Sequence, residues 1–166
     1  MTEAIANNPD AGWFVEVWQR YREHLTPGQR AELRRVAEPD DLRLVPALYT
    51  LFPGQRPGSQ HRRLAYLLNP ACSHQAGAPS LGAQMVKRGI AAPRVIQMAR
   101  AQSPIDIVQL RRLLTHLSVN LDWREVGTMV WYWGESRKRA LVEDYFIAQS
   151  QSPSSSPSSS SKGAKS

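Results

Sequence analysis

Basic side chains are concentrated in the middle of this chain, where almost no carboxylates accompany them. Residues 51–112 contain nine arginines and lysines but a single acidic residue, Asp106. These basic residues are Arg56, Arg62, Arg63, Lys87, Arg88, Arg94, Arg100, Arg111 and Arg112. The net charge of all 166 residues is only +7, so the remainder is close to neutral. A positive field confined to one stretch attracts polyanions, and nucleic acid is the first partner that the sequence predicts.

Helical periodicity separates the basic residues that should face solvent from those beside the core. In the helix expected over 104–118, the large aliphatic residues share one face and Arg112 lies on the opposite side. The helix expected over 93–101 likewise directs Arg94 and Arg100 outward, with no acidic residue among them. Phosphate groups are the ligands that such exposed guanidinium groups favour.

A second basic group combines charge with an aromatic ring. Arg62, Arg63 and Tyr66 fall within one helical turn, which places two guanidinium groups beside a phenol. This combination suits phosphates and unstacked bases. Lys87 and Arg88 belong to the same acid-poor stretch. The competing interpretation of any single one of these residues is an ordinary solvated surface charge.

Carboxylates at helical spacing distinguish two arginines near the end of the chain. Arg139 has Glu135 and Glu143 four residues away on either side, so its charge should be neutralised locally. Arg137 has no acidic residue at either spacing. We therefore count Arg137, and not Arg139, among the residues available to a polyanion.

No set of residues predicts catalysis or a cofactor. The sequence has no glycine-rich phosphate loop, no His/Glu metal motif and no serine or cysteine nucleophile with an evident base. Cys72 is the single cysteine, which excludes an intrachain disulfide, and with His74 it supplies too few ligands for structural zinc. We expect a protein that is not an enzyme and that uses no metal, no cofactor and no small-molecule substrate.

Helix signals recur along the chain and strand signals are missing, so the predicted fold is all-α. Thr26, Ser59, Ser80 and Asp122 are expected N-caps, and Ser103 is expected to open a helix through a capping box. Four of the five tryptophans stand among apolar residues and should lie in the core or at a subunit interface: Trp13, Trp18, Trp123 and Trp131. The expected helices span 10–24, 27–37, 46–52, 60–68, 81–88, 93–101, 104–118, 123–131 and 135–148.

Loop composition divides the chain into two small lobes. We expect an N-terminal helical lobe over 1–69, a connecting loop over 70–79 and a C-terminal helical lobe over 80–149. Ten of the seventeen residues in 150–166 are serine, which predicts a disordered tail. The longest strongly apolar run, 129–133, is far shorter than the ~20 residues of a membrane span. The N-terminus also lacks the pattern of a signal peptide, so we expect a cytoplasmic protein.

Four blocks of this sequence resemble one family. They are RRVAEPDDLRLVPALYTLF (34–52), SLGAQMVKRGIAAPRVIQMARA (80–101), VQLRRLLTHL (108–117) and LDWREVGTMVWYWGESRKRALVEDYF (121–146). In that order they resemble the small subunit of the type I-E CRISPR surveillance complex Cascade, the CasB family. The resemblance covers roughly residues 13–148, and 53–79 is its least similar part.

The resemblance implies a non-catalytic, two-lobed helical protein that is present as two copies in head-to-tail order. It implies as partners the other Cascade subunits and the guide RNA, together with single-stranded and R-loop DNA, including the displaced strand. Arg35, Arg94, Arg100 and Arg112 match basic positions of the family. The candidate nucleic-acid contacts are therefore Arg35, Arg62, Arg63, Lys87, Arg88, Arg94, Arg100, Arg112 and Arg137.

A sequence-specific DNA-binding regulator is the alternative function. Residues 80–101 have the pattern of a helix, a turn at Gly89 and a second helix, and Val95 and Met98 fall where a helix-turn-helix needs apolar residues. Met85 opposes this interpretation because the tight crossing of the two helices usually requires a small residue there.

Overall fold

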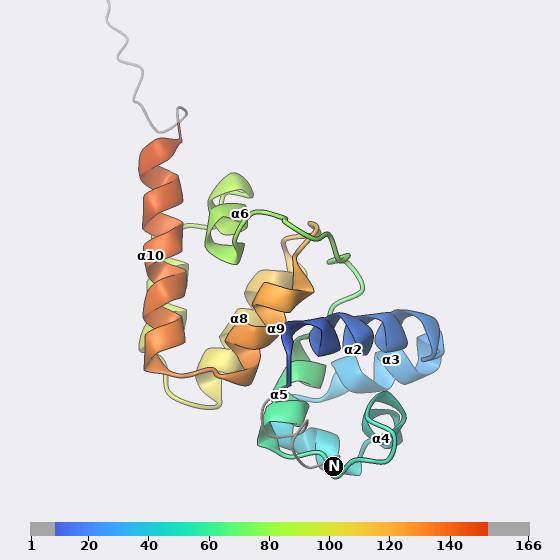
Figure 1. Ribbon diagram of the computed structural model, residues 1–166. Coiled ribbons are helices and arrows are strands. Elements are labelled where there is room, and N and C mark those ends of the chain that lie inside the picture. The colour runs from blue at the N-terminus through green and yellow to red at the C-terminus, as the bar shows by residue number, and fades with distance from the viewer. Residues whose placement is uncertain (1–8, 153–166) are drawn as a thin grey trace, which may run out of the picture.

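The computed structural model describes residues 9–152 and confirms the predicted all-α fold (Figure 1). Within that range no β-strand is present, apart from one isolated bridge between His74 and Leu121. The helices are α2 (Ala11–Glu23), α3 (Pro27–Arg35), the 3₁₀ helix η1 (Pro39–Leu44), α4 (Pro46–Leu51), α5 (Ser59–Leu67), α6 (Leu81–Lys87), α7 (Ala92–Arg100), α8 (Ile105–Thr115), α9 (Trp123–Trp131) and α10 (Glu135–Gln151).

Polar side chains cap several helices where the sequence predicts them. At the start of α3, Thr26 Oγ1 accepts a hydrogen bond from the Gln29 N–H at 3.1 Å, and Gln29 Oε1 accepts one from the Thr26 N–H at 2.8 Å. Ser80 and Asp122 cap α6 and α9. Hydrogen bonds from the Arg124 side chain lower the pKa of Asp122 to about 2, against the opposing effect of burial. Each cap contributes about 1 kcal/mol to stability.

Two predicted caps are wrong. Ser59 is the first residue of α5 rather than its cap, and the Gly58 N–H donates to His61 Nδ1 at 3.0 Å instead. At the start of α8, Ser103 makes no side-chain cap. Asp106, the expected partner of Ser103 in a capping box, points into the protein and forms the buried ion pair described below.

His61 is buried in an aromatic cage, with 4% of its surface exposed. Its ring lies 4.8 Å from the ring of Phe52 and 4.8 Å from that of Trp131, edge-on to both. Burial, reinforced by the charge of Arg62, lowers the pKa of His61 to about 4. The ring is therefore neutral near pH 7 and accepts the Gly58 N–H as part of the start of α5.

The core runs continuously through the helices on both sides of 70–79. Figure 1 shows α2 to α5 on one side and α6 and α10 on the other, with α8 and α9 between them. α9 packs against α2 and α5, and α8 packs against α5. A Cβ atom on Gly127 would lie only 2.5 Å from the Cβ of Phe14, so glycine permits the close crossing of α2 and α9. Four tryptophans lie in the core, the first of their two predicted locations: Trp13, Trp18, Trp123 and Trp131.

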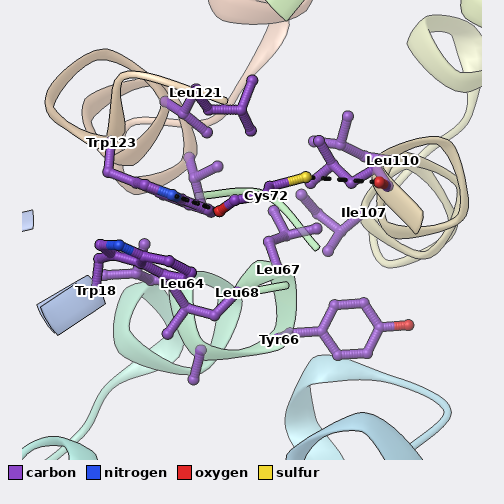
Figure 2. Packing of buried hydrophobic residues seen from close by; sticks show 14 of the residues in the cluster. Trp18, Leu64, Tyr66, Leu67, Leu68, Cys72, Ile107, Leu110, Leu121 and Trp123 are labelled. Atoms are coloured by element: carbon purple, nitrogen blue, oxygen red, sulfur yellow. Dashed lines mark hydrogen bonds between the residues drawn. The ribbon is translucent and has the colours of Figure 1, made fainter. Parts of the chain in front are cut away.

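The predicted connecting loop is bonded to the chain that precedes α9. Leu121 donates its N–H to Ser73 O at 2.8 Å and accepts a hydrogen bond from the Gln75 N–H at 2.9 Å. Figure 2 shows the buried Cys72 between two helical regions, with its carbonyl oxygen bonded to Trp123 Nε1 at 3.3 Å. The division into lobes at 1–69 and 80–149 stays a prediction, but the segment between them is held in place.

α6 lies against α10, and Gly82 allows a close approach between the two helices. A Cβ atom added to Gly82 would lie 2.6 Å from the backbone nitrogen of Tyr145. The turn after α6 has the left-handed glycine that the sequence predicts, Gly89, with φ of 78°. α6 packs mainly against α10 rather than against α7, whereas the two helices of a helix-turn-helix form one compact unit. The packing therefore does not favour the regulator interpretation.

α10 ends at Gln151, three residues beyond its predicted end. From residue 153 onward, the predicted Ser-rich tail lies outside the described residues. In the part of the chain that the structure describes, no helix combines the length and the apolar character needed to cross a membrane.

Candidate nucleic-acid interface

α7 and α8 lie side by side and form a shallow depression of about 150 Å³. Its lining consists of Arg94, Gln97, Gln109, Arg112 and Leu113. Both arginines are exposed, and neither forms an ion pair with a carboxylate within residues 9–152. Two guanidinium groups and two amides thus surround a surface without a carboxylate in its lining. Such a surface offers hydrogen-bond donors and positive charge to phosphate oxygens.

Arg111 connects this surface to α3. Its guanidinium carbon lies 3.8 Å from the centroid of the Tyr66 ring, and its Nη2 donates to Val36 O at 2.8 Å. Burial lowers the pKa of Arg111, which nevertheless remains protonated near pH 7. The contact with Val36 brings the exposed Arg35, at the end of α3, beside α8.

The end of α6 adds two more exposed cations near the other end of α8. Arg88 Nη2 donates to Ser118 O at 3.2 Å, just beyond the last turn of α8, and Lys87 precedes it. Four exposed basic residues therefore lie at or beside α8, and a fifth, Lys87, directly precedes one of them in the chain. We call this set the α8 basic surface: Arg35, Lys87, Arg88, Arg94 and Arg112.

The structure corrects the expectation that Arg62 and Arg63 are available to a ligand. Arg62 is buried, its Nε lies 3.1 Å from Asp40 Oδ1, and it also donates to Pro57 O. Arg63 donates to Val130 O at 2.7 Å and to Trp131 O at 2.8 Å. These carbonyls belong to the last turn of α9, where the ladder of intrahelical hydrogen bonds ends, and Val130 O also accepts the Trp133 N–H at 3.3 Å. Both guanidinium groups are thus occupied by the chain itself.

Arg100 and Arg137 lie apart from the α8 basic surface. Arg100 faces α10, where Glu135 and Glu143 line the same depression of about 390 Å³. Arg137 is half-buried and lines a depression of about 540 Å³ between α9 and α10, together with Asp144 and other carboxylates. Carboxylates stand beside both arginines, which distinguishes them from Arg94 and Arg112.

Asp106, the single acidic residue of the basic stretch 51–112, is neutralised by a lysine that lies outside this stretch. Helical periodicity did not predict this pairing. Asp106 Oδ2 lies 2.8 Å from Lys138 Nζ and accepts a hydrogen bond from Trp133 Nε1 at 2.9 Å. Lys138 also donates to Ala101 O at 2.8 Å. Burial alone would lower the pKa of Lys138, but the hydrogen bond and charge of Asp106 outweigh it and raise that pKa. Asp106 therefore compensates none of the exposed arginines.

The predicted neutralisation of Arg139 is wrong. Glu135 Oε2 lies 3.4 Å from Lys138 Nζ, and neither Glu135 nor Glu143 forms an ion pair with Arg139. Arg139 is exposed. Among the described residues there is also no group of three or more His, Cys, Asp or Glu that could hold a metal ion.

Comparison with known proteins agrees with the sequence resemblance. The model of the family "CRISPR-associated protein Cse2" matches residues 29–146. The CRISPR system Cascade subunit CasB of Escherichia coli (strain K12) is 35% identical over 158 residues, which cover 86% of this chain and 96% of CasB.

The fold is also similar to a chain in a solved assembly. That assembly is the crystal structure of E. coli Cascade bound to a PAM-containing dsDNA target. The matched chain has a TM-score of 0.72 and 35% identity, with coverage of 84% of this chain and 97% of that chain. The match of family model, sequence and fold over most of the chain shows that this protein belongs to the family of the CRISPR-associated protein Cse2.

Proposed function

We propose that this chain is a non-catalytic, nucleic-acid-binding subunit of a type I-E CRISPR Cascade complex. In this role it stabilises the R-loop by contacting the target and displaced DNA strands. Its partners are the other Cascade subunits, the guide RNA and a second copy of itself in head-to-tail order. The single observation that carries the proposal is the depression between α7 and α8, where Arg94 and Arg112 meet without a carboxylate.

The chemistry of this depression supports backbone binding rather than base reading. Guanidinium groups bind phosphates strongly whatever the sequence, and the amides of Gln97 and Gln109 can donate to phosphate or sugar oxygens. A subunit that holds different targets in turn needs this kind of contact. The remaining members of the α8 basic surface, Arg35, Lys87 and Arg88, extend the positive field around the depression.

The test is the lifetime of an R-loop formed by the reconstituted complex on a target duplex. We compare a complex that contains the parent chain with one that contains Arg94→Ala and Arg112→Ala together. The double variant should join the complex normally and release the R-loop at least about tenfold faster, because charge-assisted contacts are worth about 1.5–3 kcal/mol each. Equal R-loop lifetimes would refute the proposed role of this surface.

A further inference from the structure

The depression between α7 and α10 differs in chemistry from the one between α7 and α8. It has a volume of about 390 Å³. Three half-buried apolar side chains line it: Ile96, Ala99 and Val142. Charged residues of both signs complete the lining: Arg100, Glu135, Lys138, Arg139 and Glu143.

Some of the charged residues that line this depression are paired with each other or with Asp106, and the others have no ion pair among the described residues. Lys138 is engaged by the buried Asp106 and by Glu135. Arg100 and Arg139 are exposed and have no ion pair among the described residues. The depression therefore presents two available guanidinium groups above an apolar lining, and the one carboxylate without an ion pair is that of Glu143.

The apolar surface continues along α10 beyond the depression. Phe146 follows Val142 by four residues, which places it on the same helical face, and 39% of its surface is exposed. Ile147, the next residue, is 56% exposed. A contiguous exposed apolar strip bordered by charged residues is typical of a protein–protein contact surface.

Charge complementarity identifies the occupant as a protein segment. The unpaired carboxylate of Glu143 would repel the phosphates of a nucleic acid strand, and the apolar side chains beside the two arginines offer no donor to phosphate or sugar oxygens. An apolar helix face would bury this lining, and a carboxylate on that helix would pair with Arg100 or Arg139. We propose that the α7–α10 depression binds such a helix, apolar on one face and carrying at least one carboxylate, from another subunit of the assembly.

This assignment rests on the proposed function, since the occupant is another Cascade subunit, and it gives α7 two separate roles. Arg94 and Gln97 face nucleic acid on the side of α8. Arg100 and Ile96 face a protein on the side of α10. Arg100 is thereby moved from the DNA contacts to the protein contacts.

The experiment compares charge reversals on the two sides of α7 in the full chain. One variant carries Arg100→Glu with Arg139→Glu, and the matched control carries Arg94→Glu with Arg112→Glu. A third variant, Val142→Asp, tests the apolar lining without removing a positive charge. Thermal unfolding first establishes that all three retain the parent's folded state.

Two affinities are then measured for each variant. The first is association with the guide-RNA-bound complex of the other subunits in the absence of DNA, and the second is binding of a fluorescent oligo-dT strand. Arg100→Glu with Arg139→Glu, and Val142→Asp, should each weaken association at least about tenfold. Both should weaken oligo-dT binding much less than the control pair does, because they remove no guanidinium group from the α7–α8 depression, although Arg100 lies within about one Debye length of Arg94. The control pair should show the reverse pattern.

Three outcomes would overturn the inference. If Arg100→Glu with Arg139→Glu weakens oligo-dT binding as strongly as the control pair does, the depression belongs to the nucleic-acid surface. If both α7–α10 variants associate like the parent, no subunit occupies it. If the parent chain itself fails to associate, the proposed function fails and the inference fails with it, whereas the first two results leave the proposed function intact.

Discussion

Breaking the buried ion pair between α8 and α10 should cost several kcal/mol, and the adjacent residue provides a control. Lys138→Met keeps an unbranched side chain of similar length but removes the ammonium group 2.8 Å from Asp106 Oδ2. The exposed fractions of the two side chains are 5% and 3%, so water cannot replace the lost partner. Removing one member of such a pair costs about 3–5 kcal/mol, because the other charge stays buried without compensation.

The assay is thermal unfolding followed by circular dichroism. For a chain of this size each kcal/mol corresponds to about 2–4 °C, so Tm should fall by roughly 6–20 °C. Arg139→Met alters the next residue, which is exposed and has no ion pair within residues 9–152, and should change stability by no more than about 0.5 kcal/mol.

A double variant separates the lost charge from lost packing. Asp106→Asn with Lys138→Met removes both charges and keeps an oxygen that can accept the hydrogen bond of Trp133 Nε1. It should recover more than half of the loss, since replacement of both partners of a buried pair is often close to neutral. The reasoning is refuted if Lys138→Met costs less than about 1 kcal/mol, or if the double variant is no more stable than the single one.

Three further predictions concern other parts of the protein. In fluorescence anisotropy with a single-stranded oligonucleotide, Arg94→Ala with Arg112→Ala should make the plot of log affinity against log salt less steep by about 1.4, since each phosphate contact on a single strand contributes about 0.7. The pKa of His61 is lowered in the folded state to about 4 from 6.5, so the stability that its neutral ring contributes is fully present above pH 6.5 and is lost as the pH falls toward 4. This contribution amounts to about 3 kcal/mol at most. In urea unfolding, His61→Gln should remove the pH dependence of stability between pH 4 and pH 6.5 that comes from this residue. Gly127→Ala should lower the free energy of unfolding by about 1–3 kcal/mol, because the new methyl group would collide with Phe14.

Local signals in the sequence were sufficient to predict the helices and the exposure of Arg94 and Arg112. The capping box of Thr26 and the left-handed turn at Gly89 depend on residues next to them, and both are present. Periodicity also directed Arg94 and Arg112 to the polar faces of α7 and α8, where they are exposed. The meeting of these two arginines in one depression depends on how α7 packs against α8, which periodicity does not specify.

Apart from the cap at Ser59 and the pairing of Arg139, the errors concern side chains whose partners lie far away in the sequence. Arg63 binds Val130 O, which is 67 residues away, so no helical spacing could indicate that its guanidinium group is occupied. Asp106 was expected to cap its own helix and instead pairs with Lys138. Periodicity directed Arg100 outward, as it did Arg94, but could not tell that α10 and its carboxylates lie beside it.

The hydrogen bonds between 73–75 and Leu121 bear on how two copies of the chain can associate. Domain swapping requires a connecting segment that can open and extend to a second molecule. Here Ser73 and Gln75 are both bonded to Leu121, and the carbonyl of Cys72 is held by Trp123. An exchange of halves would have to break all three hydrogen bonds and expose the aromatic core between α2 and α9. The proposed pair of copies would therefore form from two closed subunits through their outer surfaces, and its dissociation would require no unfolding of either one.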